Sequence, residues 1–565
     1  MPIYRMTPLA PAYVLLIGAA LILIVGPALA PHRRHGLAMA ISALAALSLF
    51  FAGNGYPADV ELARVPWAAG ASVSAPLAGV GQGGLIEWLG TPALAVRVAP
   101  FEPFVWVLML SLLAISAAER GVVNQLSPLD QAMLFVLTAV ACGVVLAGTY
   151  STLAFTLLLF DGTAALFALA AHRPGRAVAR LFLGVLSSTA IVVLAQGTDH
   201  ATVHPVELGT LFCLTTWLRL GLYPLVESGV LLGSLPPMRL GWSVVNLLVG
   251  LYLVPASGAP WLTWLIGATA VLHGVLAWLE PSREGTLAHA AHALAGAILM
   301  MAAAVGDGPG TVAASISTLA ALVALGLTAP QLGRPEATRL HHLWAYLPPL
   351  LATASLVGVP FTLGWEGRGA LYQAAWESGA PGVLALAVIA EGAALSVMYR
   401  YWRRLLHGLP TESQPVPELE TQAPKPEDIP QSESQVWRPL GATLACIPFL
   451  VPVLGARLLL TMLPSASPSA TLSTFPLSAW WGLGGSLLWA FFLGYGRRRL
   501  LASLPTSRQT LMGALRVGWL LRNLGYALDA VGRVLLRMRA VIEGEHYLGW
   551  AILLALGLGL AILLR

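Results

Sequence analysis

Long, uninterrupted apolar stretches dominate this chain. About sixteen of them reach the roughly 20 residues that a helix needs to cross the hydrocarbon core of a bilayer. They begin near residues 11, 36, 101, 129, 150, 179, 207, 238, 259, 286, 310, 343, 381, 437, 475 and 545. Membrane strands would alternate apolar and polar residues, whereas these stretches are apolar throughout. The sequence therefore predicts an all-α polytopic membrane protein.

Composition and the placement of arginine agree with this fold class and orient it. Only 10% of the residues are charged, against roughly 25% in soluble domains. Arginines gather in alternate connections, as they do on the cytoplasmic side of membrane proteins. These connections are 31–35, 172–180, 281–284, 333–339, 400–404 and 497–499. We expect a protein of the cell inner (plasma) membrane, embedded in the lipid bilayer with its N-terminus outside, and the net charge of +5 gives no sign of nucleic-acid binding.

The first apolar run has two interpretations. Its A-L-A ending resembles the cleavage site of a secretory signal peptide. The run is long for such a peptide, however, Pro31 follows it, and basic residues come after rather than before it. We therefore expect a retained first transmembrane helix.

Cysteine spacing and known motifs point away from redox chemistry in this chain. Cys142, Cys213 and Cys446 each lie alone inside a predicted helix. No spacing predicts a metal site, an iron–sulfur cluster or a disulfide, and no phosphate loop or catalytic triad is present. We expect no cofactor and no bound metal.

The chain divides into similar halves. Two runs of about five helices each have an interrupted fourth helix, at Pro224 and at Pro360. Corresponding interruptions are typical of inverted-repeat transporters, although either proline alone would be an ordinary kink. The predicted parts are N-terminal helices (1–128), a first repeat (129–256), a second repeat (257–404), a polar cytoplasmic linker (405–436) and C-terminal helices (437–565).

The C-terminal part holds one segment of a different kind. Arginines are spaced among apolar residues over 507–542. This pattern favours a helix that lies along the cytoplasmic surface. A further crossing with buried arginines is the alternative.

Charged residues inside predicted membrane helices are the strongest functional signal. Asp161, Arg219 and Arg368 are three such residues. Arginine stays protonated in proteins, and a lone charge in the membrane is costly, so each arginine needs an anionic partner. We expect Asp161 to pair with Arg219 and to be the group that gains and loses a proton. A permanent structural ion pair is the alternative.

Acidic residues supply a second set of candidates. Glu366 and Arg368 flank the second interruption, which favours Glu366 as an outer proton acceptor with Arg368 as its counter-charge. The alternative is that both side chains extend to the membrane interface. Glu391, alone in an apolar helix, is a weaker candidate.

Histidines are the third set. His289 and His292 are three residues apart and share one side of a helix. Histidine has an ordinary pKa of about 6.5 and can relay protons at neutral pH. Histidines that only hydrogen-bond between helices are the alternative. His273, alone in its apolar helix, is a weaker candidate.

Six local motifs between residues 95 and 408 follow one order. They are Phe160 with Asp161, R-L-G-L-Y-P (219–224), Gly250 with Tyr252, A-H-A-A-H-A-L-A-G (288–296), G-V-P-F-T-L-G-W-E-G-R (358–368), and Ser396 with Tyr399 and Arg403. On these motifs the chain resembles the antiporter-like subunits of respiratory complex I, of Mrp-type cation/proton antiporters and of membrane-bound hydrogenases. A C-terminal extension like that of the longest subunit type follows.

The resemblance implies about fourteen core helices in two inverted five-helix repeats. It also implies a central polar axis that moves protons and a set of partner membrane subunits. The chain departs from the family where Arg219 and Arg368 stand in place of lysines, which can release a proton. The ionisable groups of the eleventh helix are missing from 308–327, and Glu102 is the nearest candidate for the usual acid of the third helix.

These observations favour a proton-conducting subunit of a complex I-like assembly of the NADH/quinone oxidoreductase type. Asp161, His292 and Glu366 would carry protons, with Na⁺ as an alternative ion, and partner subunits would supply the energy. The missing lysines favour a second hypothesis, a degenerate scaffold subunit that does not conduct. A stand-alone cation/proton antiporter is the third.

Overall fold

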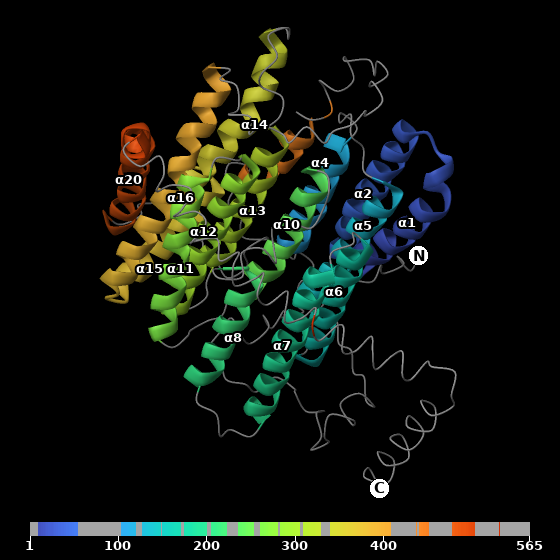
Figure 1. Ribbon diagram of the computed structural model, residues 1–565, viewed down its shortest axis with the longest axis horizontal. Coiled ribbons are helices and arrows are strands. Elements are labelled where there is room, and N and C mark those ends of the chain that lie inside the picture. Colours follow the sequence, from blue (N-terminus) through green and yellow to red (C-terminus); the bar gives the residue numbers. More distant parts are fainter. Residues whose placement is uncertain are drawn as a thin grey trace.

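In the computed structural model, the chain forms a bundle of α-helices (Figure 1). The structure describes residues 9–54, 103–119, 127–147, 150–170, 174–199, 205–222, 236–253, 260–280, 283–305, 309–328, 339–407, 437, 440–450, 477–502 and 530. The helices of this part are α1 (Ala10–Val25), η1 (Gly26–Ala28), α2 (Pro31–Asn54), α4 (Pro103–Glu119), α5 (Pro128–Val145), α6 (Tyr150–Ala170), α7 (Pro174–Asp199), α8 (Pro205–Arg219), α10 (Pro236–Tyr252), α11 (Pro260–Leu279), α12 (Arg283–Val305), α13 (Pro309–Thr328), α14 (Arg339–Val357), α15 (Leu363–Glu377), α16 (Pro381–His407), η3 (Ile447–Leu450) and α20 (Leu477–Ala502).

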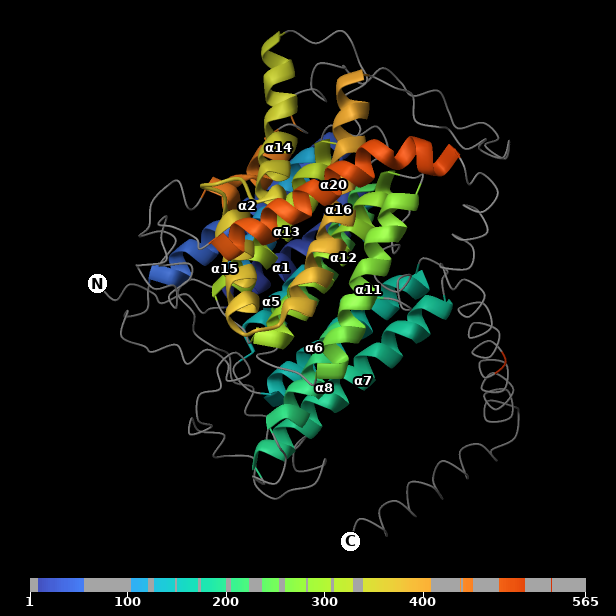
Figure 2. The ribbon, with the colours of Figure 1, turned by 90° about the vertical axis from the view of Figure 1, so that its left-hand side faces the viewer.

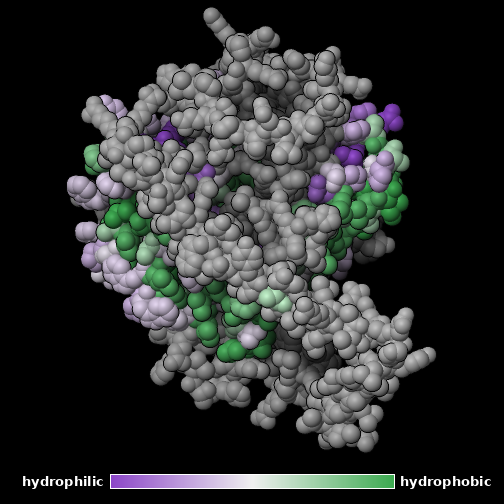
Figure 3. Space-filling model, viewed as in Figure 1, coloured by the Kyte–Doolittle hydropathy of each residue, from purple (hydrophilic) through white to green (hydrophobic). Residues whose placement is uncertain are grey.

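The predicted all-α polytopic membrane fold is confirmed. Six helices in the described part of the chain are long and apolar enough to span a membrane, and shorter apolar helices lie among them. Apolar side chains, green in Figure 3, are exposed on the flanks of the bundle. The predicted linker (405–436), the surface helix (507–542) and the final crossing lie almost entirely outside the described residues.

Prolines define where many of these helices begin. Proline opens α2, α4, α5, α7, α8, α10, α11, α13 and α16. The first turn of a helix tolerates proline because its fixed φ suits the helix and its missing N–H would have no intrahelical partner. At α5 a capping box strengthens the start, since Ser127 Oγ accepts from the Asp130 amide at 3.1 Å.

Neighbours in the bundle follow the chain order with a few crossings. Helices α1, α2, α4 and α5 pack together, and α6, α7 and α8 continue from α5. The second half packs α11, α12 and α16 against one another, with α13 between α12 and the α14–α15 pair. Helix α20 crosses α15 and α16 obliquely on the outside of the bundle (Figure 2).

The two helices that the sequence predicts to be interrupted, α8 and α14, end with the same glycine motif. In α8, Gly221 has φ +64°, and the amides of Gly221 and Leu222 donate to Leu218 O and Trp217 O. In α14, Gly358 has φ +77°, and the amides of Gly358 and Val359 donate to Ser355 O and Ala354 O. This pair of bonds is the Schellman motif, which needs a left-handed residue that glycine supplies without strain. Pro224 lies outside the described residues.

Glycines also let α15 restart close to its neighbours after the second interruption. Thr362 caps α15 by accepting from the Trp365 amide. A Cβ at Gly364 would lie 2.9 Å from Ser317 Oγ of α13, and one at Gly367 would lie 2.8 Å from the carbonyl carbon of Ala313 and closer still to the Ala314 amide nitrogen. Such distances leave no room for a side chain, so both glycines hold α15 tightly against α13.

Candidate proton-path centres

The first buried centre lies between α6, α7 and α8. Arg219 Nη2 donates to Asp161 Oδ2 and, at 2.6 Å, to Ser187 Oγ. Asp161 is 0% exposed and Arg219 is 1% exposed. The structure thus confirms that Arg219 finds its anionic partner on another helix, as the cost of burying a lone charge requires.

Arg180 reaches the same carboxylate from α7. Its Nη1 lies 3.7 Å from Asp161 Oδ1 and donates to Asn246 Oδ1 at 2.8 Å. Its guanidinium carbon lies 4.9 Å from the centroid of Trp242, within cation–π range. The prediction that Arg180 belongs to a cytoplasmic connection is therefore wrong. Helix α7 begins at Pro174, so Arg180 lies nearly two turns inside the helix, and the proline was the available signal.

Local backbone geometry favours these charges. Arg219 is the last residue of α8, where the partial negative charge of a helix C-terminus stabilises a cation. Gly184 of α7 lets Asp161 approach, because a Cβ there would lie 2.8 Å from Asp161 Cβ. Asn246 Nδ2 donates to Arg219 O at 3.4 Å. The interrupted helix and the glycine together fix the geometry of the pair.

The second centre gathers three histidines from two helices. His273 Nδ1 of α11 lies 3.3 Å from His289 Nδ1 of α12. The His273 ring stacks on His292 with centroids 5.2 Å apart. His292 Nδ1 donates to Ala288 O at 2.6 Å, which leaves its Nε2 as an acceptor. Sequence analysis ranked His273 below its neighbours because it stands alone in its helix, and only the packing of α11 on α12 brings it in.

The third centre surrounds the second interruption. Arg368 Nη2 donates to Glu391 Oε2 of α16, and Nη1 donates to Leu356 O in the last turn of α14. Tyr372 donates to the same Glu391 oxygen at 2.6 Å and lies 2.8 Å from Ser486 Oγ of α20. The Arg368 guanidinium, which extends from α15, therefore lies at the C-terminal end of α14. Arg219 likewise lies at the C-terminal end of α8, and a helix C-terminus favours a cation.

The expected pairing of Arg368 with Glu366 is wrong. Residues two positions apart in a helix are separated by about 200° around its axis, so the side chains of Glu366 and Arg368 leave α15 on opposite sides. Glu366 is half-buried in the first turn of α15. Arg368 is 4% exposed and Glu391 is 1% exposed. The buried partner comes from α16, and Glu391 matters more than its isolated position in the sequence suggested.

The helices that carry the three centres pack against one another. Trp217, two residues before Arg219, donates to Thr269 Oγ1 at 3.3 Å, and Thr269 is one turn before His273. Beyond the histidines, a Cβ at Gly274 would lie 3.0 Å from Ala390 O, the residue before Glu391. Each centre thus lies on helices in direct contact with those of the next, and we refer to the three centres together as the polar row.

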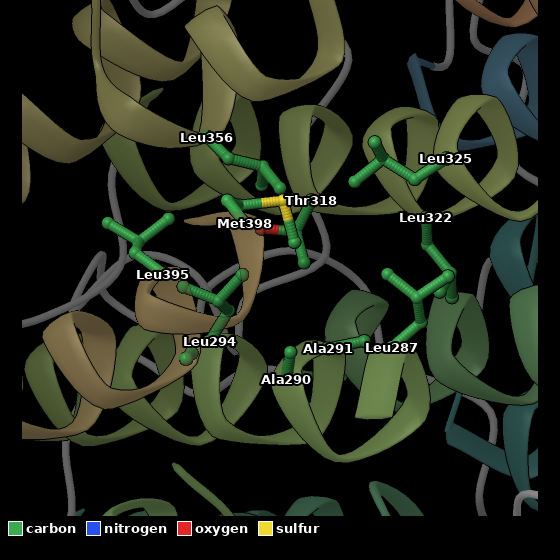
Figure 4. A pocket seen from close by; sticks show the side chains of 11 residues that line it. Leu287, Ala290, Ala291, Leu294, Thr318, Leu322, Leu325, Leu356, Leu395 and Met398 are labelled. Carbon is green, nitrogen blue, oxygen red and sulfur yellow. The ribbon is translucent and has the colours of Figure 1, made fainter. Parts of the chain in front are cut away.

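Beside this row, α12 and α13 enclose an apolar cavity. It is about 20 Å³ in volume and is lined by Leu287, Ala290, Ala291 and Leu294 of α12 with residues of α13, α14 and α16 (Figure 4). The hydroxyl of Thr318, its polar lining group, donates to Ala314 O. Since His289 and His292 lie on the opposite side of α12 from these four residues, the polar row runs on the α11 side.

Other charged or metal-binding candidates have structural explanations. Arg400, expected in a connection, lies within α16 and donates to Ala277 O and Glu280 O at the end of α11. The three cysteines are buried and free. Among the described residues, no group of three or more His, Cys, Asp or Glu side chains is arranged to hold a metal ion. Glu102 lies outside the described residues.

Comparison with known proteins finds similarity at the level of fold. No protein-family model and no curated protein matches the sequence. A chain of the Mrp complex from Dietzia sp. DQ12-45-1b matches 98% of this chain and 62% of its own length, with TM-score 0.60 and 16% identity. A chain of the archaeal membrane-bound sulfane sulfur reductase matches 98% of this chain and 99% of its own, with TM-score 0.57 and 13% identity.

Respiratory complex I from Thermus thermophilus with bound aureothin provides a third match. It covers 81% of this chain and 98% of the other, with TM-score 0.50 and 18% identity. This chain therefore spans about three fifths of the Mrp chain and nearly the full length of the other two. The chain has the fold of membrane subunits of Mrp and complex I-type assemblies, and its sequence is divergent.

Proposed function

We propose that the chain is a proton-conducting, antiporter-like subunit of a complex I-like membrane assembly. The observation that carries the proposal is the buried polar row, in which three ionisable centres lie on successively packed helices. A single structural ion pair needs no neighbours of this kind. The fold shared with chains of three multi-subunit membrane complexes supports a role beside partner subunits.

In this proposal, carboxylates and histidines carry the protons and arginines supply fixed charge. Arginine keeps its proton in proteins. When Asp161 takes up a proton, the charge on Arg219 loses its counter-charge and disfavours a further cation at the neighbouring histidines. Glu391 and Arg368 act in the same way at the far end of the row. Glu366, half-buried beside the second interruption, remains a candidate outer acceptor.

The proposal extends to the location of the chain in the cell. The polar row can couple proton movement to energy only if it crosses a membrane that holds a proton gradient. We therefore place the chain in the cell inner (plasma) membrane, with the arginine-rich connections on the cytoplasmic side. Energy would reach the row from partner subunits, since the chain is expected to contain no redox centre.

One observation favours the scaffold hypothesis as a second candidate. Both arginines are held by direct ion pairs, Arg219 with Asp161 and Arg368 with Glu391. Two further groups, Arg180 and Tyr372, contact the same carboxylates. Carboxylates held in this way permanently would support the fold without moving protons.

Proton flux separates the two candidates. The native assembly would be purified, placed in proteoliposomes and compared with its Asp161→Asn variant. We expect a sharp loss of flux, because asparagine keeps the shape of the side chain but carries no exchangeable carboxyl proton. Assembly is verified in parallel, since Arg219 and Arg180 lose their counter-charge. Glu377→Gln makes the same chemical change at an exposed site on α15 and should conduct normally. Unchanged flux in Asp161→Asn would favour the scaffold.

A further inference from the structure

A second buried polar cluster lies outside the row, where α2, α4 and α5 meet. It consists of His35 near the start of α2, Glu119 at the end of α4 and Gln131 near the start of α5. They are 1%, 3% and 2% exposed. All three lie at the end of the bundle that the arginine pattern predicts to be cytoplasmic. Neither the motifs nor the polar row accounts for them.

Gln131 joins the other two side chains. Its Nε2 lies 2.9 Å from His35 Nδ1 and donates to Glu119 Oε2 at 3.1 Å. His35 Nδ1 lies 3.5 Å from the same carboxylate oxygen. An amide nitrogen has two hydrogens and accepts none. In this arrangement His35 Nδ1 is therefore the acceptor, and the imidazole is neutral with its hydrogen on Nε2.

The cluster leaves polar atoms unsatisfied. Within the described part of the chain, His35 Nε2 and Gln131 Oε1 have no hydrogen-bond partner. No arginine there pairs with Glu119. A buried carboxylate without a counter-charge is unfavourable, and so is each orphaned polar atom. Water and a proton are the species that would satisfy these groups.

Addition of one proton changes the hydrogen-bond pattern in a defined way. A proton on His35 Nδ1 turns this atom from an acceptor into a donor. Rotation of the Gln131 amide by half a turn then brings Oε1 to accept from His35. The rotation also ends the Gln131 Nε2 donation to Glu119, and Glu119 Oε2, 3.5 Å from His35 Nδ1, faces the imidazolium instead. The imidazolium also supplies the missing counter-charge for Glu119. The protonated cluster is neutral overall, and its amide oxygen gains a donor while the amide nitrogen gives up its bond to Glu119.

We propose that His35, Gln131 and Glu119 form a proton-binding site at the cytoplasmic end of α2, α4 and α5. Its contribution to proton uptake rests on the proposed conducting function, whereas its proton binding does not. A buried hydroxyl pair continues the polar contact between α2 and α4, since Ser42 Oγ lies 3.0 Å from Ser116 Oγ. Ser42 is seven residues, or about 10 Å, farther along α2 than His35.

Other charged groups around the site are few. On α2, Arg34 is half-buried beside His35, and His32 and Arg33 are exposed. On α5, Asp130 is half-buried and accepts from Ser127 at 2.9 Å in the capping box. Arg239 is the charged residue of α10, and Asp161 of α6 is already paired. Helices α1 and α13 contain no charged residue, so His35 is the partner that the described residues offer Glu119.

Nitrogen NMR of histidine side chains in the intact native assembly tests proton binding directly. Within the pH range in which the assembly stays intact, we expect one histidine to change from the neutral Nε2–H form to imidazolium, and His35→Gln or His35→Asn to lack that signal. At the same pH, Glu119→Gln should lose most of the imidazolium signal because its counter-charge is gone. Asp130→Asn, one residue from Gln131, is the matched control and should keep it.

Two results would overturn the site. One is a His35 that stays neutral throughout the pH range in which the assembly is intact. The other is an equal loss of signal in Asp130→Asn and Glu119→Gln. Proton flux in His35→Gln tests the role in uptake, and unchanged flux removes that role. Failure of the conducting function itself would be visible separately, as unchanged flux in Asp161→Asn with the His35 signal retained.

Discussion

Arg219 and Arg368 hold a permanent positive charge at positions where a lysine could lose its proton. Lysine loses its proton readily when buried, whereas arginine does not. The guanidinium of Arg219 binds a carboxylate and a hydroxyl together, and that of Arg368 binds a carboxylate and a backbone carbonyl. Any proton movement must therefore use the acidic and histidine partners, which makes the identity of each partner decisive.

The partner of Arg368 can be tested by stability. Glu391→Gln removes the buried counter-charge, and loss of one member of a buried ion pair costs about 3–5 kcal/mol. We expect a clear fall in the unfolding temperature of the purified protein in detergent. Glu366→Gln is the matched control and should change it little, because no ion pair within the described residues uses Glu366. The opposite ranking would restore Glu366 as the partner.

At the scale of the helix, close approach between neighbours depends on single glycines. Gly184 lets α7 pack against Asp161, and Gly274 lets α11 pack against Ala390. Small residues at helix contacts are the usual means of tight packing in membranes. The same residues bring the charged centres within reach of one another, so packing and site geometry share one cause.

Gly184→Ala tests this link. The added methyl group would lie 2.8 Å from Asp161 Cβ, and overpacking of this kind costs about 1–3 kcal/mol. We expect a lower unfolding temperature and a displaced Asp161–Arg219 pair. Gly162→Ala on α6 meets nothing within 4 Å and should stabilise the helix by up to about 1 kcal/mol. Equal effects of the two substitutions would show that Gly184 does not limit the packing.

At the scale of the whole molecule, the polar row needs ionisable groups between its two charged ends, the Asp161–Arg219 pair and the Arg368–Glu391 pair. The histidine centre provides them, because α11 and α12 contact α8 on one side and α16 on the other. The apolar cavity between α12 and α13 offers no alternative ionisable group, and α13 has none in its sequence. Loss of an ionisable histidine should therefore stop proton transfer between the two charged ends of the polar row.

We expect His273→Gln to lower proton flux by about tenfold or more, which corresponds to an added barrier of roughly 1.4 kcal/mol. Glutamine keeps hydrogen bonding but does not exchange protons at neutral pH. The measurement is flux into proteoliposomes with the assembly verified intact. His32→Gln, at an exposed position on α2, is the control and should conduct as the wild type. Normal flux in His273→Gln would place the proton path elsewhere.

The sequence alone determined the membrane fold, the approximate positions of most described helices and the need of each buried arginine for an anion. Apolar length and proline position suffice for the first two, and the energetic cost of a lone charge suffices for the third. It also identified Asp161 as the partner of Arg219. The division into repeats at 129–256 and 257–404 remains a prediction, as does the exact number of core helices.

Beyond the Asp161–Arg219 pair, only the tertiary structure decided which side chains meet at each centre. Sequence analysis chose Glu366 over Glu391, placed Arg180 in a connection and ranked His273 low. A soluble helix shows its inner face through an apolar stripe, but a membrane helix that is apolar on every side shows none. The rotation of each helix, and therefore the partner of each buried charge, follows from how the helices pack and is not encoded in a visible periodicity of the sequence.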